Sequence, residues 1–103
     1  MQDKDKKIQE IQILEQNLQN LLLQKQAFQM EISETRAAKK EIEMAGEDVF
    51  KIIGQLMIKS DKSRIKDELS NKEKLLDLRI KSFEKQETAL IEKIDSLRKE
   101  ILG

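Results

Sequence analysis

The stretch DVFKIIGQLMIKS, residues 48–60, differs in composition from the sequence on either side of it. The flanking sequence is rich in Gln, Glu, Lys and Leu, as long helices are, whereas this stretch is rich in Val, Phe and Ile. Gly54 and Gln55 lie at its centre, where Gly permits the positive φ that a tight turn requires. The stretch is therefore predicted to form a β-hairpin between two helices.

Apolar residues alternate along this hairpin, as expected of half-buried strands. One wholly apolar face is expected to carry Phe50, Ile52, Leu56 and Ile58. A two-stranded hairpin is marginal alone in water and its edges pair readily, so we predict that hairpins from several subunits complete a shared sheet or barrel. The predicted assembly residues are Val49, Phe50, Ile52, Ile53, Gly54, Leu56, Met57 and Ile58. The alternative is an apolar loop that caps a single coiled coil.

An apolar series with alternating three- and four-residue spacing runs through the segment before the hairpin, from about residue 8 to residue 43. Seven of its ten positions are apolar, and no Pro or Gly interrupts it. This spacing predicts one long helix with a narrow apolar stripe, here called the seam. The exceptions in the seam are Lys25, Thr35 and Lys39, and the full series is 11, 14, 18, 21, 25, 28, 32, 35, 39 and 42.

A second series with the same spacing follows the hairpin, between about residues 62 and 102. Eight of its ten positions are apolar, and Glu73 and Glu87 are the exceptions. Ser60 or Asp61 is placed to cap the first turn of this helix. The series is 69, 73, 76, 80, 83, 87, 90, 94, 97 and 101.

Two seams of similar length joined by a short connection can bury each other if the chain folds back on itself. The alternative, two separate parallel zippers, leaves the equal lengths unexplained. The predicted fold is therefore mainly α: one domain, residues 1–103, in which an antiparallel two-helix coiled coil carries at its turn a short β-hairpin that joins an oligomeric β-barrel.

The composition argues against most other classes of protein. The 20 basic and 20 acidic residues balance, so nothing suggests a nucleic-acid or membrane-surface binder. There is no His and no Cys, and we expect no enzyme, no catalytic or metal-binding residue and no cofactor. No apolar run approaches a membrane span and no signal sequence is evident, so we expect a cytoplasmic protein.

Charge is unevenly distributed between the two helices. Between residues 8 and 30 only Glu10, Glu15 and Lys25 are charged, and seven Gln fill polar positions. Surplus apolar residues lie off the seam here and near the C-terminus, and the two ends meet in an antiparallel hairpin. We predict that this region, the tip, is an adhesive surface formed by Ile8, Ile11, Ile13, Leu14, Leu22, Leu23, Leu97, Ile101 and Leu102. Alternatively these residues only widen the packing stripe.

The central motif and the element order resemble the beta-class subunit of prefoldin. The resemblance rests on an aromatic residue followed by Lys, two aliphatics and Gly, then an aliphatic strand that ends in Lys. Here those residues are Phe50, Lys51, Ile52, Ile53 and Gly54, then Leu56, Met57, Ile58 and Lys59. The family commonly has Tyr in place of Phe50. The resemblance extends over essentially the whole chain, although the helices alone match any coiled coil.

The resemblance implies a hexamer of two alpha-class and four beta-class subunits. The strands would form a double β-barrel body, and the coiled-coil tips would hold unfolded polypeptides and pass them, without ATP, to a group II chaperonin. The competing hypothesis is a structural or adaptor coiled coil that binds one specific helical partner.

Overall fold

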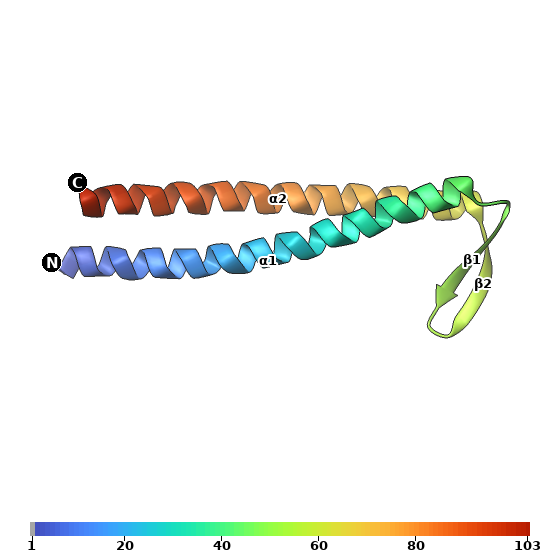
Figure 1. Cartoon of the computed structure of the whole chain (residues 1–103), viewed down its shortest axis with the longest axis horizontal. Helices are drawn as coiled ribbons and strands as arrows, with labels where there is room; N and C mark the ends of the chain where they lie inside the picture. Colours follow the sequence, from blue (N-terminus) through green and yellow to red (C-terminus); the bar gives the residue numbers. More distant parts are fainter. Residues whose placement is uncertain (1) are drawn as a thin grey trace. The chain divides into compact units, whose positions relative to one another are not determined.

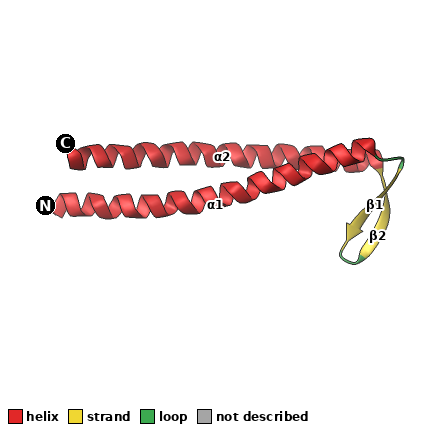
Figure 2. Cartoon of the chain, viewed as in Figure 1, coloured by secondary structure: helices red, strands yellow, loops and turns green. Residues whose placement is uncertain are grey.

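The computed structural model describes residues 2–103 and confirms the predicted order of helix, strand, strand and helix. Helix α1 spans Gln2–Met44, strand β1 Asp48–Ile53, strand β2 Leu56–Asp61 and helix α2 Lys62–Leu102 (Figure 1). Residues 45–47 and 54–55 form the loops that adjoin the strands (Figure 2).

Helix α1 begins earlier than the predicted start near residue 8. The residues between Gln2 and Ile8 are charged and have no apolar partner to bury, so an apolar pattern cannot detect them. Asp3 and Asp5 lie in the first turn, where negative charge stabilises the exposed amide groups of a helix N-terminus. Apolar periodicity thus marked only the part of α1 that can pack.

The predicted seam is confirmed, since all twenty positions of the two series are buried or half-buried. The chain divides into two compact units, and both helices contribute to each. Unit 1 consists of Met1–Phe28 and Arg79–Gly103, and unit 2 of Gln29–Leu78. Within each unit, α1 and α2 pack along the seam in antiparallel orientation (Figure 1).

The core of unit 1 is a single row of aliphatic side chains from both helices. Ile11, Leu14 and Ile94 are buried at its centre, and Leu18, Leu90, Leu97 and Ile101 pack against them. Unit 1 also contains an aromatic pair: the ring centroids of Phe28 and Phe83 lie 5.3 Å apart. The Arg79 guanidinium lies 5.5 Å from the Phe28 centroid. These contacts extend the apolar packing with aromatic and cation–π attraction.

The charged exceptions in the seam pair with one another across the helices. In unit 1 the Lys25 Nζ lies 2.7 Å from the Glu87 carboxylate, and both side chains are mostly buried. In unit 2 the Lys39 Nζ lies 3.4 Å from the Glu73 carboxylate. The four charged positions that interrupted the apolar series therefore form two matched ion pairs, which a shift of one helix along the other would break.

Thr35 is the remaining polar seam residue and is only 4% exposed. Its Oγ1 donates a hydrogen bond to the Glu31 carbonyl of the preceding turn, at 2.9 Å. A valine has nearly the same shape and removes the buried hydroxyl. We expect Thr35→Val to raise the free energy of unfolding by about 0.5 kcal/mol, because such back-bonding slightly weakens a helix. Urea unfolding followed by circular dichroism checks this; a loss of stability would mean that the hydroxyl contributes to packing.

The hairpin in unit 2 is closed by a two-residue turn. Ile53 pairs with Leu56, and Gly54 lies between them with a φ of 60°. A residue with a side chain would be strained at this φ. At the other end of β2 the amide of Ser63 donates to the Asp61 Oδ1 at 3.0 Å, so Asp61 provides the predicted cap of α2. The Lys62 ammonium donates to the Ala45 carbonyl at 2.8 Å, just beyond the end of α1.

Candidate functional site

The hairpin is too small to bury its own apolar side chains, and most of them are exposed. It is a sheet of only two strands, so each strand has one outer edge without a strand partner among the described residues. Six of its apolar side chains are between 44% and 70% exposed: Phe50, Ile52, Ile53, Leu56, Met57 and Ile58. Exposed apolar strands with open edges are typical of surfaces that pair with other chains.

The register corrects the predicted faces of this hairpin. Directly opposite residues point to the same side, and the structure pairs Ile52 with Met57 and Ile53 with Leu56. Phe50 and Ile52 therefore do not share a face with Leu56 and Ile58. Across a two-residue turn, an even-numbered residue of one strand lies opposite an odd-numbered residue of the other. The predicted faces were wrong because they continued the same even-numbered set from β1 into β2.

The two faces are defined by this pairing. The Phe50 face carries Phe50, Ile52 and Met57 together with the charged residues Asp48, Lys59 and Asp61. The Val49 face carries Val49, Lys51, Ile53, Leu56, Ile58 and Ser60. Each face thus combines apolar residues near the turn with polar or charged residues, whereas the sequence predicted one wholly apolar face.

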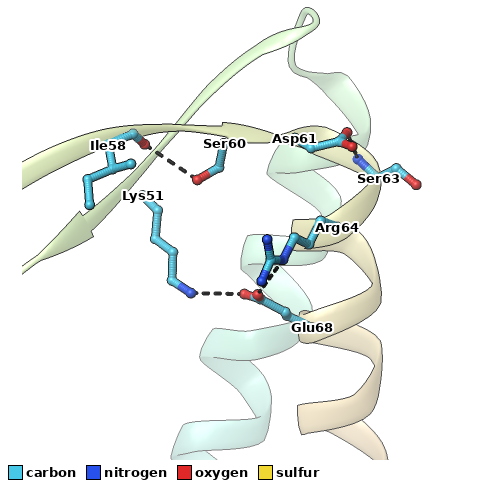
Figure 3. Close-up of polar contacts among 7 residues, drawn as sticks. All are labelled: Lys51, Ile58, Ser60, Asp61, Ser63, Arg64 and Glu68. Carbon is cyan, nitrogen blue, oxygen red and sulfur yellow. Dashed lines mark hydrogen bonds and ion pairs between the residues drawn. The ribbon is translucent and has the colours of Figure 1, made fainter.

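The Val49 face is turned toward the start of α2. Val49 is only 8% exposed, and the Lys51 ammonium donates to the Glu68 carboxylate at 3.1 Å (Figure 3). Arg64 approaches the same carboxylate at 3.7 Å, so Glu68 receives one cation from the strand and one from its own helix. Ile53 and Ile58 line a groove with Ile65 on this side. On the Val49 face, Val49 is thus buried and Lys51 is paired with α2, whereas the apolar residues nearer the turn are 44–70% exposed on both faces.

The residues predicted to form the tip differ in exposure. Ile11 and Leu14 are buried in the core of unit 1, and Leu97 and Ile101 are half-buried against it. These four hold the helices together and offer little surface. The other five are exposed to different degrees: Ile8, Ile13, Leu22, Leu23 and Leu102. Ile13, Leu23 and Leu102 are the most exposed, at 62%, 66% and 88%.

Exposed apolar residues also occur outside the predicted tip and hairpin. Leu75 and Leu78 lie one turn apart on α2 in unit 2, and Met30 of α1 is also exposed. Their positions fall outside the seam series, so the same off-seam criterion that selected Leu22 and Leu23 would have found them.

Within residues 2–103, no cluster of three or more His, Cys, Asp or Glu side chains could hold a metal ion. No helix in that range is long and apolar enough to cross a membrane.

Comparison with known proteins agrees with the architecture. The sequence profile of the family described as "Prefoldin subunit" matches residues 5–102. The chain belongs to the prefoldin family. Prefoldins are molecular chaperones and not enzymes. The predicted resemblance is thereby confirmed.

Similar proteins place this prefoldin among the beta subunits. It is 34% identical over 92 residues to the prefoldin subunit beta of Saccharolobus islandicus (strain L.S.2.15 / Lassen #1), covering 87% of this chain and 73% of that one. It is 37% identical over 89 residues to that of Thermococcus onnurineus (strain NA1), covering 84% and 77%. The crystal structure of the prefoldin beta subunit from Thermococcus strain KS-1 matches with a TM-score of 0.91 at 33% identity, over 96% of this chain and 89% of that chain. Membership of this family implies assembly with other prefoldin subunits.

Proposed function

We propose that this chain is a beta-class subunit of a cytoplasmic, ATP-independent holdase that captures non-native polypeptides and passes them to a group II chaperonin. Its assembly partners are an alpha-class subunit and further beta subunits in a hetero-hexamer. The observation that carries the proposal is that two groups of apolar side chains are exposed in the isolated chain. One is Phe50, Ile52 and Met57 on the Phe50 face of the hairpin, and the other is the set of exposed aliphatic side chains in unit 1.

An adaptor coiled coil receives less support. Such a protein needs a free apolar seam to receive the helix of its partner, whereas every seam position of this chain is already buried or half-buried within its own units. The apolar groups that remain exposed in unit 1 are scattered, and Ile13, Leu22 and Leu23 lie in a stretch rich in Gln and Asn. Such surfaces suit many clients better than one.

The proposal is tested by mixing the chain with an alpha-class subunit, isolating the complex, and diluting a denatured protein into it without nucleotide. We expect light scattering from the aggregating client to be suppressed near one complex per client. Unchanged scattering with a correctly formed complex would contradict the holdase proposal.

The contribution of the exposed tip residues is tested by Ile13→Ser, Leu23→Ser and Leu102→Ser in one chain. We expect client affinity to fall about tenfold, because each change removes apolar surface from a contact repeated across several subunits, while single changes have little effect. The control replaces Met30, Leu75 and Leu78 by serine. These residues are as exposed as Ile13 and Leu23 but lie outside the tip. Equal loss in both variants would show that the tip has no special role.

A further inference from the structure

A groove lined by uncharged amides runs between the two helices of unit 1. Asn17, Asn20 and Gln24 of α1 line one side, and Gln86 of α2 lines the other. Its floor includes Leu21 and Leu90, which belong to the seam. No ionisable side chain lines this groove, although 39% of the residues of the chain are charged.

The amides of the groove have unused hydrogen-bonding capacity. All four are exposed, and the Gln86 amide donates weakly to the Ser82 hydroxyl at 3.4 Å. Within residues 3–103, the side chains of Asn17, Asn20 and Gln24 make no hydrogen bond. Each carboxamide offers two N–H donors and one carbonyl acceptor, so the groove can both donate and accept.

A peptide group has the same two functions, one N–H and one C=O, and carries no charge. It is also the polar group that every unfolded polypeptide presents, whatever its side chains. An uncharged lining neither selects nor repels charged clients, whereas a charged lining would do both. The chemistry of the groove therefore matches the main chain, which every client has, whereas only amide and hydroxyl side chains offer the same uncharged donor and acceptor.

The spacing of the amides fits a short extended segment. Asn17 to Gln24 covers about 10 Å along the helix, which corresponds to about three residues of extended chain. Ile13 lies one turn before Asn17 on the same face of α1 and is 62% exposed, so it adds an apolar contact at one end of the amide row.

We propose that this groove binds about three residues of extended client main chain through hydrogen bonds from its amides. The inference rests on the proposed holdase function and adds a contact that does not depend on client sequence. Apolar tip residues then select exposed hydrophobic side chains, while the groove holds the main chain next to them.

The test uses two labelled peptides with the same unstructured, Leu-rich sequence, one of them N-methylated at alternate residues so that it lacks those N–H donors. Binding of each is measured by fluorescence anisotropy to the full chain assembled with its alpha-class partner. The groove variant is Asn17→Ala, Asn20→Ala, Gln24→Ala and Gln86→Ala. The control variant replaces four exposed amides outside the groove: Gln9, Gln16, Gln19 and Gln26. Ala favours helix at all eight positions, so both variants keep their helices, which circular dichroism verifies.

We expect the unmodified complex to bind the unmethylated peptide about tenfold more tightly than the methylated one. The control variant keeps this preference and the groove variant loses it. Equal binding of both peptides by the unmodified complex would overturn main-chain recognition while leaving the holdase proposal intact. A preference that survives in the groove variant would overturn the location. Failure to bind either peptide or a denatured protein would overturn the holdase proposal and this inference with it.

Discussion

Ile52→Lys is expected to leave the isolated chain folded and to abolish its assembly with an alpha-class subunit. Ile52 is 70% exposed in the isolated chain, so a lysine there disturbs no internal packing. We expect an assembled sheet to cover the Phe50 face, so that the lysine buries a charge without a partner. Such a burial costs about 4 kcal/mol, which corresponds to about a thousandfold loss in affinity.

The measurement is native mass spectrometry of the chain mixed with the alpha-class subunit, together with circular dichroism of the isolated variant. Gln55→Lys is the matched control, because Gln55 lies in the turn and carries no apolar group to the sheet. A complex of normal mass from Ile52→Lys would show that the Phe50 face remains in water, and the Val49 face would become the candidate interface.

The seam was predictable because its determinants are local. A helix places residues three and four positions apart on one side whatever else the protein does, so the spacing from Ile11 to Ile42 suffices to identify the buried side chains. Even Lys25 and Lys39, which interrupted the pattern, lie in the seam, because an interruption by a charge does not change the geometry of the helix.

The faces of the hairpin were wrongly predicted because they depend on pairing across the turn. Alternation along one strand identifies which of its residues share a side, and Phe50 and Ile52 do. Joining that set to Leu56 and Ile58 required the register, which the loop length fixes and the alternation does not.

The exposure of the tip residues could be predicted only in part. Ile11 and Leu14 lie in the seam series, so the same spacing that revealed the core already assigned them to it. Ile13 and Leu23 lie off that series and are exposed. Which exposed aliphatic groups contact a client remains a prediction, because apolar surface alone does not distinguish Leu23 from Leu75.

The ion pair between Lys25 and Glu87 is expected to set the alignment of the two helices of unit 1. Both side chains are mostly buried, at 18% and 24% exposure, so neither can easily turn to water if its partner is lost. Lys25→Glu places two carboxylates together in the seam, and we expect the free energy of unfolding to fall by about 2 kcal/mol. Glu87→Lys places two ammonium groups there and has a similar effect.

The double variant Lys25→Glu with Glu87→Lys restores the pair with its charges exchanged, and most of the lost stability should return. Urea unfolding of the four proteins gives the coupling between the two residues. The control replaces both residues by leucine, which removes the cost of burying charge. We expect the free energy of unfolding of this variant to be equal or higher. We also expect its fully apolar seam to accept more than one alignment of the two helices. If the exchanged pair is no more stable than the single variants, the attraction between these charges does not hold the helices in register.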